Sequence, residues 1–271
     1  MSKHIYQTLI VKTENKVSRV ELNRPEVHNA FNSVMIRELI HAFDEIEKDS
    51  SVRAAVLTGN GKSFCAGADL NWMREVIRYS FEQNLEESLE IAELHHKIHT
   101  LSKPAIAVVN GAAIGGGTGF LSACDLALAA EEAVFGLSEV KIGLVPAAIS
   151  PYVVKKIGES CAREYFLTGE RISAKRAYEI GLVNHFYPRH ELESRAQDII
   201  GLLLSSGPQA LTSCKELLYR VPRMSPEEAK RFTAEMIARL RISPEGQEGM
   251  AAFLEKRPPE WVEHKKGKSD V

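Results

Sequence analysis

This 271-residue chain has few cysteines, almost no net charge and no long apolar run, and each shortage excludes a class of protein. With 34 basic and 36 acidic residues its net charge is −2, which offers no general field for nucleic acid or an anionic membrane. No stretch approaches the roughly 20 apolar residues of a membrane span, and no apolar signal-peptide segment follows the N-terminus. We therefore expect a cytoplasmic globular protein that binds neither nucleic acid nor membrane.

The four cysteines are widely separated, and none forms a CxxC pair. They are too sparse for a disulfide framework and are expected to be small core residues in a reducing compartment. They are Cys65, Cys124, Cys161 and Cys214.

Two glycine-bearing turns, residues 64–70 and 111–117, are the most informative feature that is present, and each follows a short apolar run. Glycine and alanine place little bulk between a backbone N–H group and a ligand, and a helix that begins at the turn adds its positive dipole end. Either turn alone is typical of an ordinary strand-to-helix connection. As a pair, they can supply two converging donors to one oxygen, which is an oxyanion hole.

Apolar periodicity predicts an α/β core. Residues 17–22 alternate like a half-buried strand, and a helix with apolar positions from Ile36 to Ile46 follows, with Asn32 as its N-cap. Nearly continuous apolar runs at 53–58, 104–109 and 126–130 are typical of parallel strands buried on both faces. The second half is mostly helical in pattern, with N-terminal signals at Ser173, Ser225 and Ser243.

Residues 75–100 have a helical pattern that carries His95, His96 and His99. A histidine pair three or four residues apart is a possible metal ligand set, but no nearby cysteine or HExxH motif completes it. We favour a solvated helix face for these histidines, and we expect no metal.

Glu139 lies in an apolar stretch, on the same face as Phe135 and Leu137 if the strand continues. Desolvation should raise the pKa of such a carboxyl group, as a general acid/base near neutral pH requires. The alternative is a surface glutamate paired with Lys141. Asp69, in contrast, is expected to cap the helix after its turn.

Two phosphate-binding motifs fail on their spacing. Gly61-Lys62-Ser63 follows a strand, but Val56 stands where a phosphate-binding loop needs glycine. Gly117-Thr118-Gly119 is followed by Ser122 where a dinucleotide fingerprint needs glycine.

An ordered set of motifs is similar to the enoyl-CoA hydratase/isomerase (crotonase) superfamily, from about Val20 to Trp261. The motifs are Asn23-Arg24-Pro25 with Asn29-Ala30, residues 65–70, Asn110-Gly111 with Gly115-Gly116-Gly117, Cys124-Asp125 and Leu167-Thr168-Gly169. The resemblance implies a crotonase-like α/β fold of repeated ββα units over 1–200. It also implies a C-terminal helical trimerisation module over 201–271, and assembly into homotrimers or hexamers.

The resemblance also implies an acyl-CoA thioester substrate with no other cofactor. By position, the Ala68 and Gly116 amides would form the oxyanion hole and Glu139 would be the acid/base. The residues that would line the CoA path are Val27, His28, Ala30, Ala66, Asp69 and Leu70. Lys256 would reach a CoA phosphate, with a solvated lysine at a helix end as the alternative.

The chain departs from many hydratases of this family at Gly119, where they carry a second glutamate. One carboxylate suffices for a double-bond isomerase, and loss of the other also fits a non-catalytic acyl-CoA binder. Residues 68–73 and 138–152, however, resemble methylglutaconyl-CoA hydratases of leucine breakdown, whose branched substrates carry a distal carboxylate. Hydration is therefore the favoured activity, with the hypothesis that this carboxylate helps to organise the water.

Overall fold

The computed structural model describes residues 5–262. The chain divides into two compact units, Met1–Gln197 and Asp198–Val271. Both this division and the predicted boundary between residues 200 and 201 fall within helix α7 (Arg189–Ser205).

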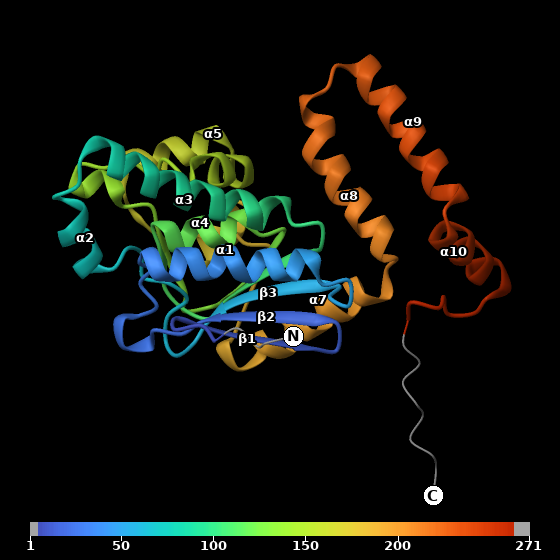
Figure 1. Cartoon of the computed structure of the whole chain (residues 1–271), viewed down its shortest axis with the longest axis horizontal. Coiled ribbons are helices and arrows are strands. Elements are labelled where there is room, and N and C mark those ends of the chain that lie inside the picture. Colours follow the sequence, from blue (N-terminus) through green and yellow to red (C-terminus); the bar gives the residue numbers. More distant parts are fainter. Residues whose placement is uncertain (1–4, 263–271) are drawn as a thin grey trace, which may run out of the picture. The chain divides into compact units, whose positions relative to one another are not determined.

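A six-stranded sheet forms the centre of the first unit, in the order β1-β2-β3-β4-β6-β9. Only β1 and β2 pair antiparallel; the pairs from β2 to β9 are parallel, as the apolar runs predicted. Every residue of β3 and β4 is buried, because helices cover these central strands (Figure 1). The strands are β1 (Leu9–Glu14), β2 (Val17–Leu22), β3 (Ala54–Gly59), β4 (Ala105–Val109), β6 (Leu126–Ala130) and β9 (His185–Tyr187).

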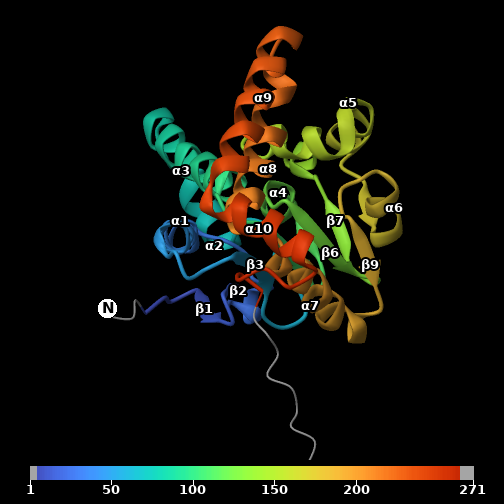
Figure 2. The same ribbon diagram turned by 90° about the vertical axis from the view of Figure 1, so that its right-hand side faces the viewer.

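A second, three-stranded sheet has the order β5-β7-β8, with β5 at Ala113–Ile114, β7 at Val134–Gly136 and β8 at Arg171–Ser173. Helices alternate with the strands, and α6 packs beside β9 (Figure 2). This mixed α/β arrangement confirms the predicted fold class. The helices of this unit before α7 are α1 (Ser33–Lys48), α2 (Leu70–Val76), α3 (Phe81–Thr100), α4 (Gly116–Ala123), α5 (Ser150–Thr168) and α6 (Ala174–Glu179), with 3-10 helices η1 (Pro25–Val27) and η2 (Glu139–Ile142).

Helix starts follow the predicted caps, with one correction. The Asn32 side chain accepts from the Met35 N–H at 3.0 Å, as expected for α1. The helix predicted over 75–100 is instead two helices, because α2 ends at Val76 and Ser80 begins α3 with a capping box.

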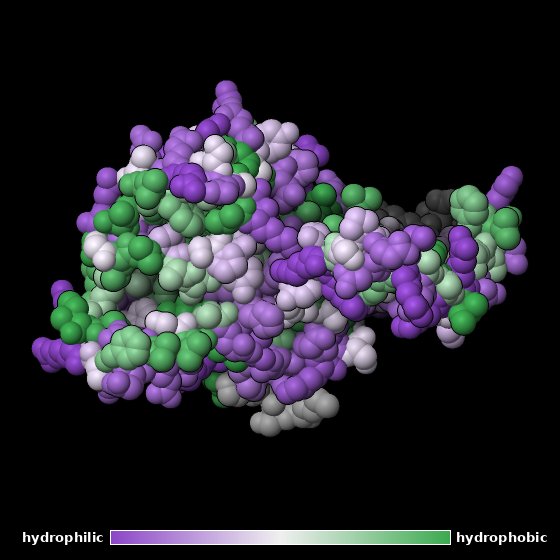
Figure 3. Space-filling model, turned by 90° about the horizontal axis from the view of Figure 1, so that it is seen from above, coloured by the Kyte–Doolittle hydropathy of each residue, from purple (hydrophilic) through white to green (hydrophobic). Residues whose placement is uncertain are grey.

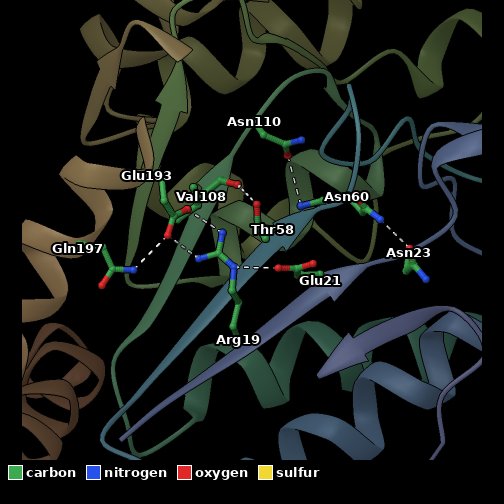
Figure 4. A network of polar contacts seen from close by, with 10 residues as sticks. Arg19, Glu21, Asn23, Thr58, Asn60, Val108, Asn110, Glu193 and Gln197 are labelled. Carbon is green, nitrogen blue, oxygen red and sulfur yellow. Dashed lines mark hydrogen bonds and ion pairs between the residues drawn. The ribbon is translucent and has the colours of Figure 1, made fainter. Parts of the chain in front are cut away.

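A polar network ties β2 to the start of α7 inside the first unit (Figure 4). The Arg19 guanidinium donates to both carboxylate oxygens of Glu193, at 3.0 and 2.8 Å, and its Nε donates to Glu21. Gln197 donates to Glu193 from the next turn of the helix. Two-point contact fixes the guanidinium plane, so this network holds the start of α7 against β2.

The second unit contains α8 (Pro208–Arg220), η3 (Val221–Arg223), α9 (Pro226–Ile242) and α10 (Pro244–Glu255). Ser225 and Ser243 cap α9 and α10 as predicted, each followed by proline at the first helical position. The Glu245 carboxylate accepts from the Gln209 and Ala210 N–H groups, which fixes the start of α8 against the start of α10.

Apolar side chains interrupt the polar surface (Figure 3). In the first unit they include Leu70, Ile77, Phe81, Leu85 and Leu89, all on α2, α3 or the link between them. No helix among residues 5–262 is long and apolar enough to cross a membrane. The prediction that all four cysteines are core residues is wrong in part: Cys65 and Cys124 are buried, Cys161 is half-buried and Cys214 is exposed.

Candidate active site

The first glycine turn is held as a short parallel bridge between Phe31 and Ala68. The Phe31 N–H donates to the Gly67 carbonyl and the Phe31 carbonyl accepts from the Asp69 N–H, both at 2.8 Å. In such a bridge the residue opposite directs its own N–H to the other side. The Ala68 N–H therefore points away from Phe31, and no residue in 5–262 accepts a hydrogen bond from it.

The second turn leads directly into α4. Gly115 has φ of 55°, a conformation that favours glycine, and its N–H donates to the Gly136 carbonyl at 2.8 Å. The first N–H of the helix belongs to Gly116, which precedes every intrahelical acceptor. This N–H also has no acceptor in the described part of the chain, and it lies at the positive end of the helix dipole.

Two contacts bring the turns together. Cys65 of the first turn pairs with Ala113 of the second in a parallel bridge. Phe31, which pairs with the first turn, also packs its ring against Gly116 of the second. A Cβ atom at Gly116 would lie 2.5 Å from Phe31 Cε1, and one at Gly117 would collide with the Cys65 carbonyl. The second turn needs glycine at both positions because of this close packing.

Asp69 holds the first turn through all of its polar atoms. Its Oδ1 accepts from the N–H groups of Asn71 at 2.7 Å and Trp72 at 3.4 Å, which confirms the predicted cap. Its Oδ2 accepts from Arg24 at 2.6 Å, and the same guanidinium donates to the Ala30 carbonyl at 2.7 Å. Burial works to raise the pKa of Asp69, but the hydrogen bonds from Arg24 and the two amides outweigh it and leave that pKa lowered.

Glu139 is not on a strand: β7 ends at Gly136, and Glu139 begins η2. The strand prediction is wrong because alternation over 135–139 is too short to separate a strand from a 3-10 turn. Glu139 Oε1 lies 3.2 Å from the position of a Cβ atom at Gly115, so the carboxyl group faces the second turn.

The Glu139 carboxyl group is mostly enclosed. Its Oε2 is buried with no hydrogen-bond partner among the described residues, and burial raises its pKa, as predicted. The Lys141 side chain extends instead over Gly169, so the structure does not favour the alternative of a Glu139–Lys141 pair.

The residues predicted to line the CoA path fall on two adjoining segments. The Ala66 N–H donates to the His28 carbonyl at 3.0 Å, which joins the segment after η1 to the first turn. Val27 and Leu70 are exposed, whereas Ala30 is buried and offers little surface to a ligand. Lys256 is an exposed residue at the end of α10, in the second unit, with φ of 56°.

The prediction of a solvated histidine face on α3 is wrong for His95, which has no exposed surface. His96 is exposed. Within residues 5–262 no group of three or more His, Cys, Asp or Glu side chains is arranged to hold a metal ion. The buried position of His95 was missed because residues 75–100 alternate glutamate and leucine irregularly, which weakens the apolar stripe.

The comparisons with known proteins agree on the family. The family model described as "Enoyl-CoA hydratase/isomerase" matches residues 12–265. A short-chain-enoyl-CoA hydratase of Clostridium acetobutylicum is 34% identical over 92% of this chain and 95% of its own length. A 2,3-dehydroadipyl-CoA hydratase of Escherichia coli is 31% identical, covering 93% of this chain and 98% of its own.

Solved structures give the same result. An enoyl-CoA hydratase from Shewanella pealeana superimposes with a TM-score of 0.91 at 42% identity, over 94% of this chain and 96% of its own. The chain belongs to the enoyl-CoA hydratase/isomerase family, and its α/β core has the crotonase fold.

Proposed function

We propose that the protein hydrates α,β-unsaturated acyl-CoA thioesters in the cytoplasm. In this proposal the Ala68 and Gly116 N–H groups bind the thioester oxygen, and Glu139 is the acid/base. One observation carries the assignment: the enclosed Glu139 carboxyl group faces Gly115, the residue that leads into the free N–H of Gly116.

The reaction needs one base and one charge stabiliser. The Glu139 carboxylate takes a proton from water as the water oxygen bonds to the β-carbon, and the double-bond electrons move toward the thioester oxygen. The two amides stabilise that oxyanion, each contributing about 3 kcal/mol in comparable sites. The proton then passes to the α-carbon, and Glu139 is again a carboxylate.

The proposed substrate is a branched enoyl-CoA with a distal carboxylate, like methylglutaconyl-CoA of leucine breakdown. Residues 68–73 and 138–152 support this proposal by their resemblance to hydratases that act on such substrates. The E. coli relative supports it as well, because its name describes the CoA thioester of a dicarboxylic acid. The resemblance also supports binding of CoA phosphate by Lys256 and assembly as a homotrimer or hexamer. The exposed Phe253 and Leu254 of α10 would suit such an interface.

A mass-spectrometric panel of enoyl-CoA thioesters tests the function. Hydration adds the mass of one water, isomerisation leaves the mass unchanged, and a non-catalytic binder consumes nothing. We expect a gain of water, faster with 3-methylglutaconyl-CoA than with crotonyl-CoA. Equal rates on the two would remove any role for the distal carboxylate, and no gain of water on any thioester would refute the hydratase proposal.

A further inference from the structure

His95 is a fully buried imidazole to which the mechanism above gives no role. Its ring stacks on those of Phe120 and Tyr152, with centroid distances of 5.3 and 5.9 Å. Its Nδ1 lies 2.7 Å from the Ile91 carbonyl oxygen, which can only accept, so we assign the ring proton to Nδ1. Nε2 is then an acceptor, and it makes no hydrogen bond to any residue in 5–262.

The imidazole is neutral at physiological pH. Burial disfavours the imidazolium and lowers the pKa of His95 to about 4, and the nearby Ile91 and Gly116 carbonyls oppose this only in part. A buried acceptor without a partner costs about 1–3 kcal/mol. Such an atom in a native structure points to a bound polar partner or a catalytic role.

Nε2 points at the position where many hydratases of this family carry their second glutamate. A Cβ atom at Gly119 would lie 2.6 Å from Nε2 and still closer to a methyl group of Ile149. The imidazole and Ile149 therefore occupy the space in which a side chain at residue 119 would begin. This packing leaves no room for a carboxylate at residue 119, and a polar atom, His95 Nε2, lies beside its place.

Glu139 and His95 approach the start of α4, one at the N-cap residue Gly115 and the other one turn further on. Glu139 Oε1 faces Gly115, His95 Nε2 faces Gly119, and the Gly119 N–H donates to the Gly115 carbonyl at 3.1 Å. The backbones of Gly115 and Gly119 are therefore separated by about one helical turn, about 5–6 Å. Each side chain has a buried acceptor without a described partner, Oε2 in one and Nε2 in the other. One water that donates two hydrogen bonds of about 2.8 Å each joins acceptors about 4.5 Å apart, a span of the same order as this turn.

We infer that His95 is the second water-binding residue of the active site, with Nε2 accepting one hydrogen bond while Glu139 accepts the other. The inference rests on the proposed hydratase function. His95 takes no proton: it holds the water so that its lone pair faces the β-carbon, and Glu139 alone removes the proton. The role of the absent carboxylate thus passes from residue 119 to residue 95.

The test compares His95→Leu, which removes the acceptor, with His95→Gln, whose amide oxygen keeps an acceptor at about the reach of Nε2 on a more flexible side chain. His96→Leu is the matched control, because it changes the neighbouring, exposed histidine. We measure kcat and KM for crotonyl-CoA and 3-methylglutaconyl-CoA, together with the melting temperature. Crotonyl-CoA has no carboxylate of its own, so on this substrate the second acceptor must come from the protein.

We expect His95→Leu to lower kcat by at least about 100-fold on both substrates, the scale of a lost acid/base partner, with KM within about threefold. Its melting temperature should fall by only about 2–6 °C, because the substitution removes the hydrogen bond from Nδ1 to the Ile91 carbonyl while the site stays filled by an apolar side chain. His95→Gln should fall between wild type and His95→Leu, and His96→Leu should match wild type.

Two results overturn the inference. The first is a His95→Leu variant whose kcat stays within about threefold of the wild-type value on either substrate. If only the kcat for 3-methylglutaconyl-CoA is kept, the carboxylate of that substrate holds the water instead of His95. The second is a loss of kcat accompanied by a fall in melting temperature of more than about 10 °C, well beyond the loss of one hydrogen bond, which assigns His95 a packing role. Failure of the hydratase proposal is distinct from both, because wild type would then hydrate neither substrate.

Discussion

The turns that carry Ala68 and Gly116 present their amides in different ways. The first is held by polar side chains: Arg24 donates hydrogen bonds to Asp69 and to the Ala30 carbonyl, and Asp69 caps α2. The second is held mainly by close packing, because its glycines lie directly against the Phe31 ring and the Cys65 backbone, and by the Thr118 hydroxyl, which donates to the Ala113 carbonyl. Removing one partner of an ion pair weakens the first turn without forcing its backbone to move. An atom added to the close-packed second turn must displace the neighbouring backbone. The two halves of the proposed oxyanion hole should therefore respond differently to mutation.

Replacing Glu139 with glutamine should have the largest effect, because it removes the base and leaves both turns intact. We expect kcat for hydration to fall by about 10³-fold, within the usual range for loss of a general base. The dissociation constant of a saturated acyl-CoA, measured by calorimetry, should change little. A variant that hydrates at the wild-type rate would show that Glu139 is not the acid/base.

Disrupting the second turn should have the second largest effect. Gly117→Ala places a Cβ atom against the Cys65 carbonyl, so the backbone must move, and overpacking of this kind costs about 1–3 kcal/mol of folding free energy. Chemical denaturation and hydration rates should both show the loss. Gly201→Ala is the control, since a Cβ atom there, within α7, meets nothing within 4 Å. That change should stabilise the chain by about 0.5–1 kcal/mol. Equal effects of the two substitutions would contradict close packing of the second turn.

Removing the Arg24 cation should weaken the first turn and lower kcat moderately, without unfolding the protein. Arg24→Met leaves Asp69 with its two capping bonds but without its cation, at a cost of about 1–3 kcal/mol for a nearly buried pair. We expect kcat to fall about 10-fold, corresponding to about 1.4 kcal/mol of lost transition-state stabilisation. Arg19→Met breaks the more exposed pair with Glu193 and should cost less than about 1 kcal/mol, with no effect on kcat. If both variants had the same kcat, Arg24 would have no part in placing the Ala68 amide.

The smallest effect should be on pH-dependent stability. Burial raises the pKa of Glu139 above its ordinary 4.5, so the folded state holds this proton more tightly than the unfolded state. The stability of wild type relative to Glu139→Gln should therefore be greatest below pH 4.5 and decline as the pH rises through the raised value. Unfolding free energies of both proteins from pH 4 to 8 check this. A difference that does not change with pH would mean that the Glu139 pKa is ordinary.

The sequence predicted the elements whose pattern is local. The caps at Asn32, Ser225 and Ser243 and the buried strands β3, β4 and β6 were readable, because each depends on neighbours within a few residues. The break between α2 and α3 was not predicted, since the capping signal of Ser80 lies inside an otherwise helical pattern.

The candidate site was predictable only in part for the same reason. The two turns and Glu139 were marked by their own residues, but the contacts that align them join distant parts of the chain. Phe31 meets Gly116, and His95 meets Gly119, across separations that no periodicity encodes. The Arg24–Asp69 ion pair was likewise not predicted from the sequence, although both residues lie within motifs that pointed to the family.

The most direct test is a crystal structure of the Glu139→Gln variant with an enoyl-CoA bound and unreacted. The account predicts that the thioester oxygen lies within about 3.2 Å of both the Ala68 and Gly116 nitrogens, with the β-carbon on the side of residue 139. A thioester oxygen bound by other groups, with these two amides facing solvent or protein, would contradict it.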